Sequence, residues 1–120
     1  MEREIYGVIY LLTNMINRKV YVGQTNRSFK IRMIEHYYSM TASEPSNKHL
    51  VNAFKKYEWE NFKKEVIYEA YSADDLDDVE ELFIIQYNSR NSKYGYNKKA
   101  GGANHSLTDE QIQNRRKRAD

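Results

Sequence analysis

Two short apolar runs near the start of the chain flank a polar stretch. The first, IYGVIYLLT, is rich in the β-branched and aromatic residues that favour strands, and the second reads RKVYVGQ. The asparagines of NMIN, which lies between them, suit a turn. This pattern predicts a β-hairpin over Ile5–Gln24. Because its apolar positions are nearly continuous, we expect at least one face of the hairpin to pack against helices.

Helical spacing follows the hairpin. Ser28 is a suitable N-cap for FKIRMIEHYYSM, in which Phe29, Met33 and Tyr37 recur every four residues. The polar stretch TASEPSN, with the only proline, separates this helix from a second one, KHLVNAFKKY, which Ser46 or Asn47 can cap. The apolar face of the second helix is expected to consist of Leu50, Val51 and Phe54.

The second half of the chain predicts one more strand, KKEVIYEA, and one more helix. Ser72 can cap ADDLDDVEELFIIQYN, whose acidic first turn suits the positive end of the helix dipole. The fold class is therefore α+β: a small three-stranded antiparallel sheet flanked by helices, in the order β-β-α-α-β-α. The core stripe of the last helix is expected to consist of Leu76, Val79, Phe83 and Ile84.

The 120 residues fit one domain of ordinary size. We expect residues 1–104 to form it, because the glycines of AGGANH indicate that the compact part is ending. Residues 105–120 predict a basic helix or arm, with Thr108 and Gln111 as a capping box and a basic run at Arg115–Arg118.

Composition narrows the setting. The absence of cysteine excludes disulfides and thiolate metal sites. No apolar run approaches the roughly 20 residues that span a bilayer, and MEREIYG lacks the apolar core of a signal peptide. These observations predict a cytoplasmic protein that makes no membrane contact.

Charge is unevenly distributed along the chain, although the net charge is only +2. Residues 1–40 hold six basic and three acidic side chains, residues 41–89 hold five and eleven, and residues 90–120 hold eight and three. Two basic ends could hold a polyanion such as DNA. An unevenly charged, solvated surface is the alternative.

Arg32 and His36 lie four residues apart and share a helix face. The planar guanidinium of arginine suits a phosphate, and histidine can move protons. Since Met33 and Tyr37 are expected to face the core, the pair is predicted at the surface or in a cleft. An ordinary solvent-facing pair remains the alternative.

Glu81 lies in the middle of the last predicted helix, close to Phe83 and Ile84. A carboxylate there could reach a partly buried site and hold Mg²⁺, which keeps most of its waters and needs few protein oxygens. A solvated helix face is the alternative.

Tyr10 and Tyr21 lie on the two strands of the predicted hairpin and are expected to be approximate cross-strand neighbours. Gly23 would leave the same face open for a close approach. A catalytic tyrosine must lose a proton whose ordinary pKa is about 10, and a nearby cation such as Arg32 would lower that pKa. Aromatic core filling is the alternative.

Six short segments occur in a recognisable order: VIY (Val8–Tyr10), YVG (Tyr21–Gly23), RMIEH, ELFII, GYN and AGG. Together they resemble the GIY-YIG nuclease domain, in the form found in phage and intron-type homing endonucleases, over nearly the whole chain. The chain departs from the family pattern at two places. Val8 stands where the first motif has glycine, and Gln24 stands where several family members have lysine.

The resemblance implies hydrolysis of phosphodiester bonds in DNA with a single divalent metal ion, Mg²⁺ or Mn²⁺. Carried over to this sequence, Glu81 would hold the metal, and Tyr21 would be the general base with Tyr10 in its hydrogen-bond network. Arg32 would stabilise the charged transition state, and His36 would orient the nucleophile or relay protons.

The resemblance further implies that Asn97 braces the site through a side-chain hydrogen bond. Homing members continue into a separate DNA-recognition domain, so such a domain or a partner is expected. A catalytically silent DNA-binding module of the same fold is the alternative, and loss of Glu81 or Arg32 would have favoured it. A protein-binding domain with a chance motif would show no salt-dependent DNA binding. DNA contacts are expected from Gly23, Gln24, Arg27 and Lys30.

Overall fold

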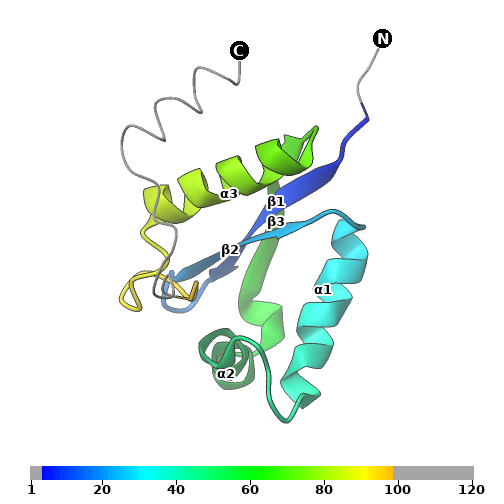
Figure 1. Cartoon of the computed structure of the whole chain (residues 1–120). Coiled ribbons are helices and arrows are strands. Elements are labelled where there is room, and N and C mark those ends of the chain that lie inside the picture. Colours follow the sequence, from blue (N-terminus) through cyan, green and yellow to red (C-terminus); the bar gives the residue numbers. More distant parts are fainter. Residues whose placement is uncertain (1–3, 99–120) are drawn as a thin grey trace.

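The computed structural model describes residues 4–98 and has the predicted order of elements (Figure 1). Two short 3₁₀ turns, Ser39–Thr41 and Trp59–Asn61, join the main elements. The predicted arm over residues 105–120 lies outside the described residues. The main elements are β1 (Gly7–Asn14), β2 (Val20–Thr25), α1 (Phe29–Tyr38), α2 (Lys48–Tyr57), β3 (Phe62–Ala70) and α3 (Ala73–Tyr87).

The three strands form an antiparallel sheet in the order β2-β1-β3, in which β1 and β2 form the predicted hairpin. In the hairpin, Tyr10 pairs with Gly23 and Leu12 pairs with Tyr21. Tyr10 and Tyr21 are therefore diagonal neighbours on one face, one pleat apart, and their ring centroids are 6.4 Å apart.

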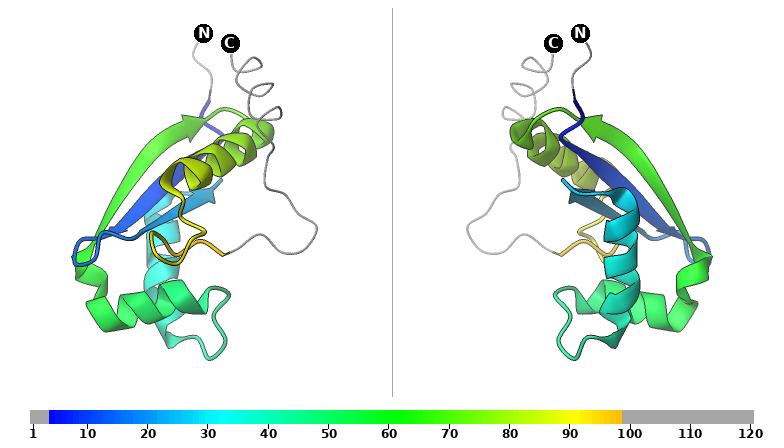
Figure 2. Two further views of the ribbon diagram at one scale, coloured as in Figure 1. Left: turned by 90° about the vertical axis from the view of Figure 1, so that its left-hand side faces the viewer. Right: turned by 90° about the vertical axis from the view of Figure 1, so that its right-hand side faces the viewer.

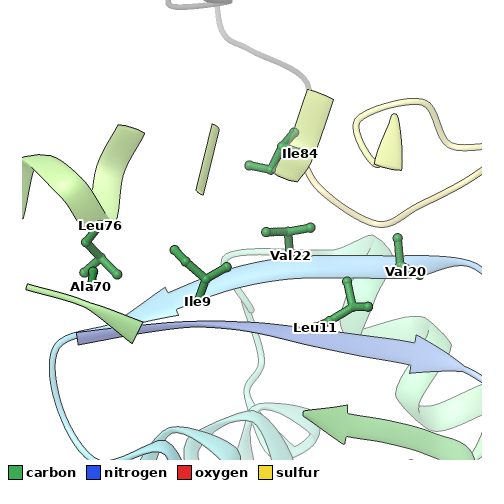
Figure 3. Packing of buried hydrophobic residues seen from close by; sticks show 7 residues of the cluster. All are labelled: Ile9, Leu11, Val20, Val22, Ala70, Leu76 and Ile84. Atoms are coloured by element: carbon green, nitrogen blue, oxygen red, sulfur yellow. The ribbon is translucent and has the colours of Figure 1, made fainter. Parts of the chain in front are cut away.

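Helices cover both faces of the sheet (Figure 2). Because side chains alternate along a strand, residues 9 and 11 of β1 face α3, and residues 10 and 12 face α1 and α2. Figure 3 shows the core on the α3 side, which consists of Ile9, Leu11, Val20, Val22, Ala70, Leu76 and Ile84. The core on the other face consists of Tyr10, Leu12, Leu50, Ala53, Phe54, Phe62 and Tyr96.

The buried stripe of α1 differs from the predicted one. Phe29 and Met33 pack against the core as expected, but Tyr37 is 45% exposed and His36 is the buried residue of this helix. The stripe follows the spacing i, i+4, i+7, because eight residues turn an α-helix 80° beyond two full turns, whereas seven fall only 20° short. Because His36 is buried, the alternative of a solvent-facing pair does not hold for His36.

The other helices agree with the sequence pattern. Ser72 caps α3 by accepting a hydrogen bond from the Asp75 backbone N–H at 3.0 Å, and Asn47 caps α2 in the same way through the N–H of Leu50. Within residues 4–98, no helix combines the length and the apolar character needed to cross a membrane.

Candidate active site

Tyr10 is the centre of a polar cluster inside the α1-facing core. Its side chain is fully buried, and its hydroxyl lies 2.7 Å from Nε2 of His36. The Nε–H of Arg32 donates to the same hydroxyl at 3.2 Å. Residues 32 and 36 reach one phenol because four residues of α1 make about one helical turn.

Gly23 makes room for this phenol. An ideal Cβ at position 23 would lie only 2.6 Å from the Cε2 ring carbon of Tyr10 and still closer to its hydroxyl. The sequence suggested that Gly23 leaves the face beside Tyr21 open. In the structure the ring of Tyr10 fills this space. Gly23 itself is buried.

The hydrogen bonds of Tyr10 determine which group donates the proton and which group accepts it. Arg32 can only donate, so the Tyr10 oxygen accepts from it and its own proton is free for His36. Burial, and then the charge of Arg32, lower the pKa of His36 to about 4, so the imidazole is neutral at neutral pH. Its Nε2 can then accept from Tyr10, which places the ring proton on Nδ1. Burial raises the pKa of Tyr10, which keeps the phenol protonated.

Tyr21 is the phenol with access to the outside. It is half-buried, and its ring centroid lies 5.7 Å from that of His36. Burial raises its pKa, Arg32 lowers it, and the carboxylate of Glu80 raises it. The charge of the same carboxylate also raises the pKa of Tyr10.

Glu81 has a different environment. The guanidinium of Arg90 holds its carboxylate with two hydrogen bonds of 2.5 and 2.6 Å. One residue turns the helix by about 100°, so adjacent glutamates of α3 point in different directions. Glu80, not Glu81, is the carboxylate whose charge raises the pKa of Tyr10 and Tyr21.

The spacing of buried residues along α3 contains a signal that points to Glu80. Leu76 and Ile84, the two fully buried residues of α3, lie four residues before and four residues after Glu80. All three therefore share the inward face of the helix. A carboxylate in the middle of such a stripe is a stronger candidate for a function than one beside it.

Burial raises the pKa of Glu80, and the neighbouring carboxylates of Asp77 and Glu81 add to that effect. A hydrogen bond from Gln24 and the charge of Arg90 act in the opposite direction. The distance from Nε2 of Gln24 to Oε1 of Glu80 is 2.9 Å.

Among residues 4–98, no three side chains of His, Asp or Glu gather as a closed metal cage. The donor chemistry nevertheless fits Mg²⁺ or Mn²⁺. These ions prefer oxygen ligands, and Mg²⁺ is commonly held by one or two carboxylates together with waters and substrate phosphates. Glu80 offers a partly buried carboxylate whose charge acts on both phenols, whereas both oxygens of Glu81 are occupied by Arg90.

Asn97 braces the edge of β2. Its Oδ1 accepts from the N–H of Val22 at 2.9 Å, and its Nδ2 donates to the carbonyl of Val22 at 2.8 Å. The side chain thus pairs with the strand as a neighbouring backbone would. Val22 lies between Tyr21 and Gly23, so the brace acts where the strand carries the site. The hydrogen bond expected for Asn97 is present.

The residues expected to contact DNA lie in different settings. Arg27 and Lys30 are exposed near the start of α1, and Arg27 forms an ion pair with Glu35. Nη1 of Arg32 donates to the same carboxylate at 3.2 Å. Gly23 is covered by Tyr10, and Gln24 directs its amide to α3.

Comparison with known proteins gives a consistent result. The catalytic domain of the homing endonuclease I-TevI has 28% identical residues and superposes with a TM-score of 0.66, over 78% of this chain and 98% of that domain. A glutamate-to-alanine mutant of the same domain has 28% identical residues and a TM-score of 0.66, over 76% of this chain and 91% of that domain. No curated protein sequence matches. Residues 6–103 match the family described as the GIY-YIG catalytic domain. The chain therefore belongs to the GIY-YIG family and contains its catalytic domain.

Proposed function

We propose that the protein is a metal-dependent DNA endonuclease in which Glu80, rather than Glu81, holds the single divalent ion. The observation that carries this proposal is a set of five chemically complementary groups: two phenols, a guanidinium, a neutral imidazole and a carboxylate of α3 whose charge acts on both phenols. The family membership supports phosphodiester hydrolysis as the reaction.

Glu80 is the residue that would hold Mg²⁺ or Mn²⁺. When bound, such an ion supplies positive charge to the phosphoryl oxygen and to the leaving group. The effect of this carboxylate on the pKa of both phenols supports the assignment, because the ion and the general base must act on the same phosphate.

Tyr21 is the general base of the proposed mechanism. The Tyr21 side chain is less buried than that of Tyr10, which favours Tyr21 as the phenol that meets a water molecule at the substrate. The raised pKa of Tyr21 in the free protein means that the phenol must lose its proton before it can act. Arg32 lowers that pKa, and a bound cation would do the same.

Arg32 stabilises the negative charge that develops at phosphorus. Hydrogen bonds to Tyr10 and Glu35 fix its guanidinium before the substrate arrives, and preorganised charge of this kind is the main source of transition-state stabilisation. His36 accepts a hydrogen bond from the hydroxyl of Tyr10 and so holds that phenol in place. Asn97 supports the strand that carries Tyr21.

We infer that the substrate is DNA, and that a separate DNA-recognition domain or a partner supplies sequence preference. Arg27 and Lys30 are the exposed cations near the site that would contact phosphates. A chain without cysteine is consistent with an intracellular substrate.

Two adjacent glutamates give a matched test. Supercoiled plasmid is incubated with Mg²⁺ or Mn²⁺ and the wild-type chain, Glu80→Gln or Glu81→Gln. We expect nicking or linearisation by the wild type and by Glu81→Gln, and loss of at least about 100-fold in rate with Glu80→Gln. The reverse order would return the metal to Glu81. DNA binding without cleavage by the wild type would indicate the silent module.

A further inference from the structure

The amide of Gln24 connects β2 to two carboxylates of α3. Side chains alternate along β2, so Tyr21 and Gly23 face α1, whereas Gln24 faces α3. Its Nε2 lies 2.9 Å from Oδ1 of Asp77 and 2.9 Å from Oε1 of Glu80. One amide nitrogen has two N–H groups, so each carboxylate receives one of them.

We propose that Gln24 is a positioning residue of the metal site, which holds the Glu80 carboxylate at the edge of β2. The proposal rests on the proposed function, which assigns the metal to Glu80. It gives Gln24 a role different from the DNA contact that the sequence suggested, because both of its donors are directed to α3.

Glu80 needs such a partner because its neighbours pull its carboxylate in other directions. Asp77 lies one turn earlier on the same helix and repels it. Arg90 is near enough to attract it, although this guanidinium already holds Glu81. A flexible glutamate without Gln24 would move away from Asp77 and towards Arg90. The hydrogen bond from β2 opposes both movements.

The chemical type of this partner is important. A lysine or arginine at position 24 would fix the carboxylate but would also cancel the charge that attracts a cation. The amide of Gln24 is neutral, so it orients Glu80 and leaves the negative charge available. Residues that orient metal ligands in this way typically contribute about 10–100-fold to metal affinity or activity.

The test is a Mn²⁺ titration of the whole chain, followed by paramagnetic broadening of backbone amide signals in the absence of DNA. The variants are Gln24→Met, which has a similar length and no donor, and Gln86→Met as a control. Gln86 is an exposed glutamine of α3. We expect broadening centred on residue 80 in the wild type and in the control, and about tenfold weaker Mn²⁺ binding in Gln24→Met.

Cleavage kinetics separate positioning from general damage. The Mn²⁺ concentration for half-maximal cleavage should rise about tenfold in Gln24→Met, while the rate at saturating Mn²⁺ stays within a few-fold of the wild type. Gln24→Asn is a second variant in case Gln24→Met does not fold. Its shortened amide cannot reach Glu80, so it should weaken Mn²⁺ binding in the same direction.

Two results would overturn the inference, and they differ. Equal Mn²⁺ affinity in the wild type, Gln24→Met and Gln24→Asn, combined with lost binding in Glu80→Gln, removes the role of Gln24 and leaves the metal on Glu80. Unchanged Mn²⁺ binding in Glu80→Gln removes the metal assignment itself, and the inference fails with it.

Discussion

The ring of Tyr10 lies across the backbone of Gly23 on the neighbouring strand, in the space that a side chain at position 23 would occupy. This contact places the Tyr10 hydroxyl between His36 and Arg32. The glycine of the YVG segment is therefore a packing requirement of the phenol, and the two motifs act as one unit.

Gly23→Ala should disturb both the fold and the site. The added methyl group overlaps the ring of Tyr10, and overpacking of this kind typically costs about 1–3 kcal/mol of unfolding free energy. The displaced hydroxyl should lower the cleavage rate at least about tenfold, because near-contact geometry at a catalytic site tolerates little movement. Urea unfolding and plasmid cleavage measure the two effects. Wild-type stability in this variant would show that the ring can move freely.

The two phenols should respond differently to loss of the hydroxyl. Tyr21→Phe should keep its stability and lose about 10²–10⁴-fold in cleavage rate, the usual contribution of a general base. Tyr10→Phe should lose about 1–3 kcal/mol of stability, because the buried Nε2 of His36 is left without its partner. Single-turnover cleavage and urea unfolding of both variants provide the comparison. A larger rate loss in Tyr10→Phe would exchange their assigned roles.

His36 should make the folded state sensitive to acid. Its pKa falls from an ordinary value of 6.5 to about 4 on folding, so between these values the unfolded chain binds more protons than the folded one. The stabilisation is fully present above pH 6.5 and is lost as the pH falls towards 4, by about 3 kcal/mol in total. Urea unfolding at several pH values measures this slope. His36→Gln has no ring to titrate, so its unfolding free energy should not show this loss. Between pH 6.5 and 4 the wild type should lose about 3 kcal/mol more unfolding free energy than the variant.

Asn97→Ala should open the edge of β2. It leaves the N–H and the carbonyl of Val22 without their partner, at a cost of about 1–3 kcal/mol. Hydrogen exchange at the Val22 amide should become faster, and cleavage should weaken because Tyr21 is next in the strand. Asn97→Asp keeps the acceptor and loses the donor, so its Val22 amide should stay better protected than in Asn97→Ala. Equal exchange rates in the wild type and both variants would contradict the brace.

The sequence was sufficient for the fold because each element has a local cause. Alternation and β-branched residues predict the strands, and Ser28, Asn47 and Ser72 cap the helices as expected. The site was harder to predict because it depends on which face of a helix each residue occupies. One residue of rotation separates His36 from Tyr37, and an offset of one residue in the assumed stripe of α1 placed Tyr37 in the core instead of His36. The same small rotation separates Glu80 from Glu81, and the proposal of Glu80 as the metal ligand rests on their different surroundings.

Contacts between distant segments were out of reach for a different reason. The bond from Gln24 to Glu80 spans 56 positions and the bond from Val22 to Asn97 spans 75. Both hydrogen bonds depend on how α3 and the segment after it pack against the edge of β2. No local pattern contains that information, although the alternation along β2 does predict that Gln24 and Tyr21 face opposite sides of the sheet.

The brace formed by Asn97 also sets a time order on biosynthesis. A ribosome that has not yet passed codon 97 has already made both phenols, Arg32, His36 and Glu80, yet the strand that presents Tyr21 still has an open edge. Synthesis of Asn97 is therefore needed before this edge of β2 can be closed. A nascent chain carries the site's other residues without this brace, and a chain that ends before this codon should present Tyr21 on a less stable strand.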